Sequence, residues 1–179
     1  MIQKKVCMVG LYATGKTSLV RRFVQSIFSE KYHSTVGVKI DRKLVGLGPT
    51  AVNLLLWDIE GRSPEHDVPA SYLRGAHAVF FVADGTRRET FEQLFDLERS
   101  TRAATGDVPS IVALNKSDLR DQWALAAADV EKLRAGGFHT VNTSAKTGDG
   151  VEDAFRWLAE ATLKASAAPD SGAGGHDER

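Results

Sequence analysis

Residues 10–17 read Gly-Leu-Tyr-Ala-Thr-Gly-Lys-Thr, a GxxxxGKT spacing that could bind the phosphates of a nucleoside triphosphate. Glycines let such a loop turn its backbone N–H groups inward, and the positive end of the following helix strengthens the anion site. Lys16 would bring a mobile charge to the outer phosphates, and the Thr17 hydroxyl could ligate Mg²⁺. We therefore expect a phosphate-binding loop, with contacts from Gly10, Ala13, Thr14, Gly15, Lys16, Thr17 and Ser18.

A second group of this kind follows a later apolar run, in Trp57-Asp58-Ile59-Glu60-Gly61. Asp58 would help to hold Mg²⁺, through a water molecule, and the backbone of Gly61 can approach a terminal phosphate closely. An Asp-x-x-Gly segment also occurs in ordinary polar turns. Alone, such a segment is therefore weak evidence for a Mg²⁺ site.

Two further polar segments, residues 115–118 and 144–146, have the chemistry to select a guanine base. The carboxylate of Asp118 can accept both the ring N–H and the amino protons of guanine, and Asn115 can bond the imidazole edge and brace the phosphate loop. Adenine presents an acceptor to that carboxylate and a donor to the N–H of Ala145, and such mismatches let polar sites reject analogues. Lys116 and Lys146 would cover the ring faces with their aliphatic stems, and Ser144 completes the second segment.

The elements around these motifs follow from the alternation of apolar, β-branched runs with helical patterns, which is typical of an α/β fold with a mostly parallel sheet and helices on both faces. Strands are expected near 2–9, 37–46, 51–57, 77–83, 110–114 and 138–142. Helices are expected near 16–27, 66–74, 88–104, 126–135 and 150–165. Glycine and proline in residues 45–50 predict a hairpin turn, hence one antiparallel edge strand in a six-stranded P-loop NTPase sheet. Ligands of such sheets bind beyond the carboxyl ends of the strands, where the motifs should meet.

Composition limits the remaining possibilities. The 179 residues suit one domain, residues 1–165, followed by a tail at 166–179 that lacks large apolar residues and is expected to be disordered. Twenty-three Lys plus Arg balance 23 Asp plus Glu, so no charge surplus indicates nucleic-acid binding. The single cysteine and the absence of a long apolar run or leader pattern predict a cytoplasmic protein. The pairs Arg21-Arg22 and Arg87-Arg88 are expected to be solvated helix-end charges.

In this order, the four motifs resemble the Ras superfamily of small GTPases, and within it the Rab branch, over residues 4 to 165. The resemblance implies a protein that binds Mg²⁺ with GDP or GTP, hydrolyses GTP and acts as a molecular switch. By position it assigns Thr35 to Mg²⁺ and the γ-phosphate, Phe28 to the guanine, and Tyr32 to the phosphates. It also implies that protein regulators and effectors bind through switch regions at about 28–40 and 59–75.

Two residues depart from the family pattern. Arg62 stands where the family keeps the glutamine that orients the attacking water, and Tyr12 stands where a glycine is usual. Arg62 cannot accept a hydrogen bond from water, so it is either a built-in arginine finger, a sign of a slow enzyme, or a solvated residue without a role. Glu60, Glu65 or His66 could position water instead, although exposed switch positions are the simpler interpretation. Because the Tyr12 ring should crowd the γ-phosphate, we predict slow hydrolysis.

The tail departs from the family too, since it lacks the cysteines that carry prenyl chains, and Met1-Ile2 excludes N-terminal myristoylation. No direct lipid anchor is therefore expected, as in unlipidated prokaryotic Ras-like GTPases, and a monomer is favoured. The main alternative to a switch is a scaffold that stays bound to GTP with negligible hydrolysis. A P-loop kinase is disfavoured, because the segments at 115–118 and 144–146 indicate guanine.

Overall fold

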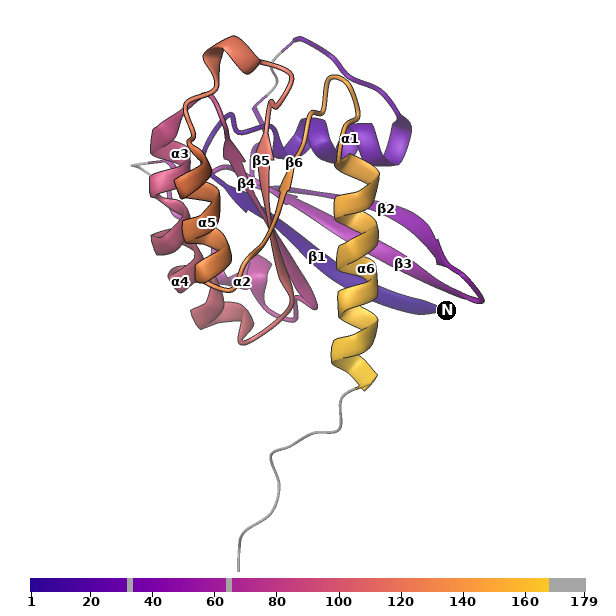
Figure 1. Ribbon diagram of the computed structural model, residues 1–179. Helices are drawn as coiled ribbons and strands as arrows, with labels where there is room; N and C mark the ends of the chain where they lie inside the picture. Colours follow the sequence, from indigo (N-terminus) through magenta and orange to yellow (C-terminus); the bar gives the residue numbers. More distant parts are fainter. Residues whose placement is uncertain (32–33, 64–65, 168–179) are drawn as a thin grey trace, which may run out of the picture.

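A single six-stranded sheet forms the centre of the computed structural model, which describes residues 1–31, 34–63 and 66–167 (Figure 1). In space the strand order is β2-β3-β1-β4-β5-β6. The strands are β1 (Ile2–Gly10), β2 (Val38–Leu47), β3 (Thr50–Ile59), β4 (Ala78–Asp84), β5 (Ser110–Asn115) and β6 (His139–Asn142). Every neighbouring pair is parallel except β2 and β3. The predicted fold class, with one antiparallel edge strand, is thus confirmed.

The hairpin between β2 and β3 lies where glycine and proline predicted it. Leu47 pairs with Thr50, so Gly48 and Pro49 form a two-residue turn. Gly48 has a φ of +68°, a backbone conformation that glycine adopts without steric cost. The turn folds β2 back along β3 and leaves β2 as an edge strand.

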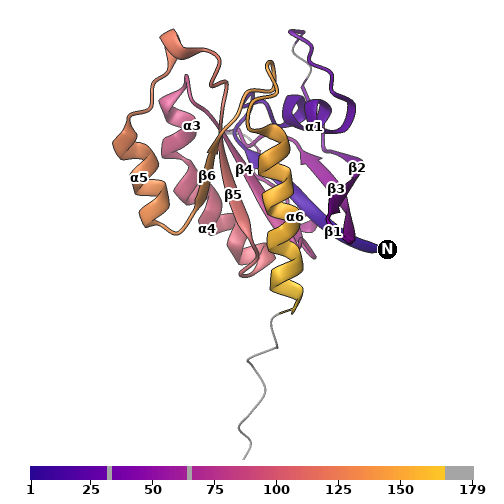
Figure 2. The ribbon, with the colours of Figure 1, turned by 45° about the vertical axis from the view of Figure 1, so that its right-hand side comes forward.

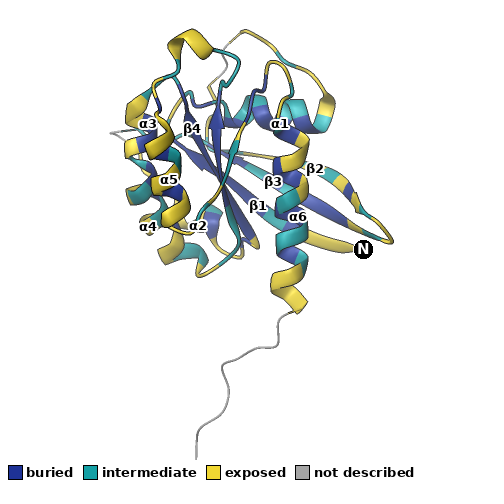
Figure 3. Ribbon diagram, in the orientation of Figure 1, coloured by how far each residue is buried: buried dark blue, intermediate teal, exposed yellow. Residues whose placement is uncertain are grey.

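Helices cover both faces of the sheet, as Figures 1 and 2 show. One face carries α1 (Lys16–Gln25) and α6 (Val151–Ala167), and the other carries α2 (Ala70–Leu73), α3 (Arg88–Glu92), α4 (Leu94–Thr105) and α5 (Ala127–Ala135). Alternate residues of β1 serve the two faces: Val6 and Met8 join the first apolar cluster, and Cys7 and Val9 join the second. This two-sided burial explains why the central strands read as continuous apolar runs (Figure 3).

Two of the predicted helices were wrong in extent. The helix expected at 66–74 is limited to α2, because Pro69 at its start has an extended backbone and biases the preceding residue away from the helical region. Gly75, with a φ of +70°, follows its end. The single helix expected at 88–104 is two helices that share Gln93 as a boundary. A short 3₁₀ helix, η1 (Arg120–Gln122), was not predicted, because one turn has no detectable periodicity.

The last helix, α6, ends at Ala167, two residues beyond its predicted end. Ser166, assigned to the tail from the sequence, lies in this helix, and its hydroxyl accepts a hydrogen bond from Lys4 Nζ of β1. The rest of the predicted tail, 168–179, lies outside the described residues. None of the helices in the described part of the chain combines the length and apolar character needed to cross a bilayer.

Phe155 is the aromatic centre of the first apolar cluster and gives a direct test of its packing. Its ring is fully buried, stacks on Phe23 at 4.1 Å between centroids, and lies 4.7 Å from Phe80. We expect Phe155→Ala to lower the free energy of unfolding by about 3–5 kcal/mol, because it removes a large buried ring and leaves a cavity. Urea denaturation with saturating GDP and Mg²⁺ measures this. Phe95→Ala, at a half-buried ring, is the control, and equal losses for the two variants would contradict the expectation.

Candidate functional site

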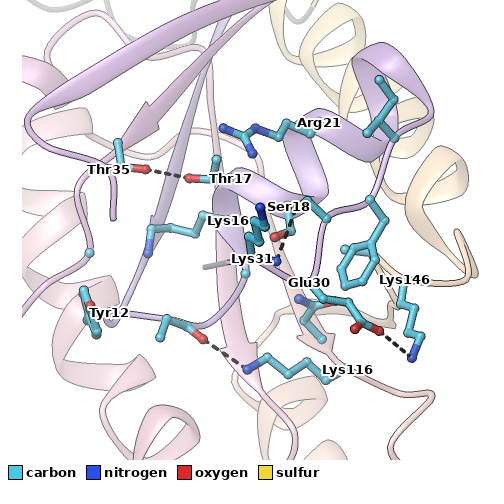
Figure 4. A pocket seen from close by; sticks show the side chains of 18 of the residues that line it. Tyr12, Lys16, Thr17, Ser18, Arg21, Glu30, Lys31, Thr35, Lys116 and Lys146 are labelled. Atoms are coloured by element: carbon cyan, nitrogen blue, oxygen red, sulfur yellow. Dashed lines mark hydrogen bonds and ion pairs between the residues drawn. The ribbon is translucent and has the colours of Figure 1, made fainter. Parts of the chain in front are cut away.

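A cavity of about 410 Å³ lies at the edge of the sheet where β1, β3, β5 and β6 end (Figure 4). Most of the residues expected from the sequence to form the site line it: Tyr12, Ala13, Gly15, Lys16, Thr17, Ser18, Phe28, Thr35, Gly61, Asn115, Lys116, Asp118, Ala145 and Lys146. Five others, Gly10, Thr14, Asp58, Arg62 and Ser144, are not part of the lining. Tyr32 lies outside the described residues.

The phosphate loop connects β1 to α1, and the buried side chain of Lys16 points toward carbonyl groups of the loop itself. Lys16 Nζ donates to the carbonyl oxygens of Gly10 at 3.2 Å and Leu11 at 2.9 Å. Burial lowers the pKa of Lys16 to about 8, against an opposite effect of the Asp58 carboxylate. A phosphate group at this place would offset the burial by supplying negative charge. The loop is thus built to bind an anion at the start of α1.

Two glycines let the loop take this shape. A Cβ on Gly10 would lie 2.5 Å from the Val82 carbonyl oxygen of the neighbouring strand, so a side chain does not fit there. Gly15 has a φ of +99°, and a Cβ on it would lie 2.3 Å from Nδ2 of Asn115. That Nδ2 donates to the Thr14 carbonyl at 3.0 Å. The glycines therefore bring the loop into contact with β4 and with the residue at the end of β5.

Gly15→Ala should weaken guanine nucleotide binding by about 10²-fold, because it adds backbone strain of roughly 1–3 kcal/mol and displaces Asn115 from the loop. Gly48→Ala is a matched control, since Gly48 also has a positive φ, +68°, but has nothing within 4 Å of the added Cβ. The control should lose stability and keep its affinity. Titration with a fluorescent GDP analogue measures both constants, and equal affinities for the two variants would refute this role of Gly15.

The three predicted Mg²⁺ ligands, Thr17, Thr35 and Asp58, lie close together. Thr17 Oγ1 lies 2.6 Å from Thr35 Oγ1 and donates to Oδ2 of Asp58, also at 2.6 Å. The second carboxylate oxygen, Oδ1, is buried and has no hydrogen-bond partner among the described residues. Burial raises the pKa of Asp58. Two hydroxyls and a buried carboxylate with one unsatisfied oxygen fit a hard cation that prefers oxygen ligands, as Mg²⁺ does.

The base end of the cavity is formed by the segments that follow β5 and β6. Asn115 is buried, bonds the phosphate loop through Nδ2, and accepts a hydrogen bond from Thr143 at 3.2 Å. The Ser144 hydroxyl donates to Oδ1 of Asp118 at 2.6 Å, which orients the carboxylate from behind. Ser144 thus acts on the cavity through Asp118. The arrangement presents a carboxylate and, beside it, the backbone of Ala145 to the cavity.

Sequence reasoning missed a clamp on the base-binding segment. Arg22 was predicted to be a solvated helix-end charge, but its Nε donates to the Ala145 carbonyl at 2.7 Å and its NH2 to the carbonyl of Lys146. Across the cavity mouth, Lys146 Nζ lies 3.4 Å from the Glu30 carboxylate, an ion pair visible in Figure 4. The segment is therefore held from α1 and from the first predicted switch region.

A second missed feature supports the outer side of the phosphate loop. Asp84, fully buried at the end of β4, lies 2.6 Å from Lys116 Nζ and 3.2 Å from Arg87 Nε. Both cations also bind carbonyls of the loop, Lys116 that of Ala13 and Arg87 that of Tyr12. Burial tends to raise the pKa of Asp84, but the hydrogen bonds from Lys116 and Thr86 keep it below its ordinary value.

Arg88 is an exposed charge at the start of α3, as predicted, but both Arg87 and Arg88 also make specific ion pairs that the prediction did not include. Arg87 belongs to the support just described, and Arg88 makes a two-pronged ion pair with Asp129 of α5, at 2.8 and 3.0 Å. Motif spacing gives no signal for these contacts, since Arg87 reaches 75 positions along the chain and Arg88 reaches 41.

The segment after β3 lies directly against the phosphate loop. The N–H of Tyr12 donates to the carbonyl of Arg62, and the N–H of Arg62 donates to that of Gly10, both at 3.1 Å. A Cβ on Gly61 would lie 2.6 Å from Tyr12 Cα, so only glycine allows this approach. The Arg62 side chain does not line the cavity, and its Nε lies 3.3 Å from an Asp67 carboxylate oxygen. Tyr12 is one of the residues that line it.

The Glu60 carboxylate also has a structural partner. Its Oε2 accepts a hydrogen bond from the Gly37 N–H at 3.0 Å, and its own N–H donates to the Gly37 carbonyl at 2.8 Å. These bonds link the two predicted switch regions. They also engage one oxygen of the carboxylate that could otherwise position water. Glu65, the second candidate for that role, lies outside the described residues.

Comparisons with known proteins agree on one family. The profile of the Ras family matches residues 5–164. Ras-related protein Rab-1 of Theileria annulata is 32% identical over 160 residues, which cover 88% of this chain and 73% of that protein. Ras-related protein Rab-32A of Dictyostelium discoideum is 35% identical over 170 residues, with coverage of 89% and 78%. Ras-related protein RABA4b of Arabidopsis thaliana is 33% identical over 156 residues, with coverage of 86% and 70%.

Proposed function

Because this chain belongs to the Ras family and is Rab-like, it is a small GTP-binding protein of the GTPase switch class, and we propose that its own hydrolysis of GTP is slow. The cavity supports the nucleotide assignment, since it has an anion site at Lys16 and a guanine-compatible carboxylate at Asp118. The observation that carries the slow rate is the placement of two residues: Tyr12 is among those that line the cavity, and Arg62 is not.

We assign the roles along the nucleotide as follows. The loop and Lys16 bind the phosphates, Gly61 meets the terminal phosphate through its backbone, and Phe28, packed on the first apolar cluster, borders the base. Thr17, Thr35 and Asp58 would hold Mg²⁺, which when bound neutralises charge on the phosphate oxygens. Asn115 and Asp118 read the guanine, and Lys116 and Lys146 flank it.

The reaction that follows is the attack of water on the γ-phosphorus, with cleavage of its bond to the GDP oxygen and passage of the water proton to phosphate. The family pattern uses a glutamine to orient this water. Arg62 carries only donors and is engaged by Asp67, so it does not replace the glutamine's acceptor. The aromatic ring of Tyr12 would occupy space beside the terminal phosphate. Both features support a slow chemical step.

The same two residues support a second candidate function, a scaffold that stays GTP-bound without useful turnover. A single-turnover assay separates the two: protein loaded with GTP labelled at the γ-position is followed for release of labelled phosphate with Mg²⁺ present. A slow but complete release indicates a switch. Release no faster than that of free GTP indicates a scaffold.

We further propose that partners bind through the regions at about 28–40 and 59–75. The bonds between Glu60 and Gly37 support this, because they join the two regions to each other. Next to Gly37, Val36 is 84% exposed, and Ile40 on the edge strand β2 is 52% exposed. Exposed apolar side chains beside γ-phosphate-sensing Thr35 suit partners that distinguish GTP from GDP.

The cellular location we propose is the cytoplasm. Cys7 is buried and forms no disulfide, which supports this location.

A further inference from the structure

Arg21 is a cavity residue that the known motifs do not include. It lies on α1 one helical turn after Thr17, so both residues share a face of the helix. Arg21 lines the nucleotide cavity together with Thr17 and Thr35. Figure 4 shows its guanidinium extending toward the side on which these two threonines meet. Long helical side chains lean toward the N-terminus of their helix, which here is the phosphate end.

The guanidinium of Arg21 has no hydrogen-bond or ion-pair partner in the part of the chain that the structure describes. Three other arginines all have partners. Arg22 donates to two carbonyls, Arg62 pairs with Asp67, and Arg87 binds Asp84 and the Tyr12 carbonyl. Arg21 is only half-exposed, yet it offers five N–H donors. A partly buried cation with unmet donors inside an anion-binding cavity points to the anion as its partner.

We propose that Arg21 is a ligand of the terminal phosphate of GTP, reaching it from α1 on the side of Thr35 and opposite Lys16. This rests on the guanine nucleotide function proposed above. A planar guanidinium can make two parallel hydrogen bonds to phosphate oxygens, which Lys16 cannot. Charge on these oxygens is what a stabilising arginine acts on in phosphoryl transfer. Arg21, and not Arg62 as considered from the sequence, would then be the built-in arginine that stabilises this charge.

The test compares Arg21→Ala with Arg99→Ala, which removes the same charge from an exposed position on α4. Arg21→Ala should weaken binding of the GTP analogue GMPPNP with Mg²⁺ by about 10- to 100-fold, the effect of losing charge-assisted hydrogen bonds. Its affinity for GDP should change by less than about threefold, and its single-turnover hydrolysis should fall at least tenfold. Arg21→Lys should recover part of the affinity, since it restores the charge without the fork.

A ³¹P NMR spectrum of bound GMPPNP distinguishes contact from an indirect structural effect. The γ-phosphorus resonance should move in Arg21→Ala and stay in place in Arg99→Ala. Wild-type constants for both ligands in Arg21→Ala, or equal losses for GMPPNP and GDP, would overturn the assignment and leave the proposed function intact. Failure of the wild-type protein to bind either ligand would instead refute the proposed function. Circular dichroism of the GDP-bound variants confirms that each is folded.

Discussion

Replacement of Asp118 by asparagine should change the base that this protein prefers from guanine to xanthine. The Asp118 carboxylate lines the cavity and is oriented by the Ser144 hydroxyl at 2.6 Å. It can accept both the ring N–H and the exocyclic amino group of guanine. An asparagine amide would turn its NH₂ toward that amino group, which places two donors against each other. Xanthine has a carbonyl at this position, so it would accept the new hydrogen bond.

The expected loss of GDP affinity in Asp118→Asn is large, about 10³- to 10⁵-fold, because the site would leave polar groups unpaired. The affinity for xanthosine diphosphate should rise in the same variant and exceed that for GDP. Asp121→Asn is the control, since it removes a carboxylate three residues away at an exposed position. Competition against a fluorescent nucleotide gives the affinities of both variants for GDP and for xanthosine diphosphate. A variant that still prefers GDP would show that Asp118 does not read the base.

The double variant Tyr12→Gly/Arg62→Gln should hydrolyse GTP about 10²-fold faster than the unchanged protein. Glycine at position 12 removes a ring that is 48% exposed and borders the cavity. Glutamine at position 62 restores a side chain that both donates to water and accepts from it. A positioned group of this kind typically contributes 10²- to 10⁴-fold to a reaction with proton transfer. The gain should therefore appear in the single-turnover rate constant, and nucleotide affinity should change little.

The two single variants show how the effect is divided. Arg62→Gln alone should gain less than the double variant, because the Tyr12 ring still occupies the space beside the phosphate. The backbone bonds of residue 62 to the loop do not depend on its side chain, so the fold should be unaffected. Arg120→Gln in η1 is the control for loss of a surface arginine. An unchanged protein that turns over GTP faster than the double variant would contradict slow hydrolysis.

Much of the arrangement could be predicted from the sequence, because local patterns determine it. A parallel sheet brings the carboxyl ends of its strands to one edge, so motifs at residues 10–17, 58–61, 115–118 and 144–146 had to meet. The hairpin at Gly48 and Pro49 depends on two residues whose backbone preferences are strong. These features depend on short segments or on a general rule of sheet topology, and both can be read from sequence.

The supporting arginines could not be predicted in this way. Arg22 bonds a carbonyl 123 positions away, and Arg87 bonds one 75 positions away. A backbone carbonyl is present at every residue, so no residue type marks it as the partner. The length of α2 was overestimated for a different reason. Helical periodicity alone extends back toward residue 66, but Pro69 keeps the helix from beginning before Ala70. Arg21 was classed as solvated because its cavity exists only after folding.

The nucleotide that co-purifies with the protein tests the central claim most directly. The protein is purified without added nucleotide and denatured, the released compound is identified by chromatography, and a second sample loaded with γ-labelled GTP is followed for hours. We predict that the released compound is GDP or GTP and that the labelled phosphate appears slowly, over minutes to hours. Release of an adenine nucleotide, or failure to load GTP in the presence of Mg²⁺, would contradict the account.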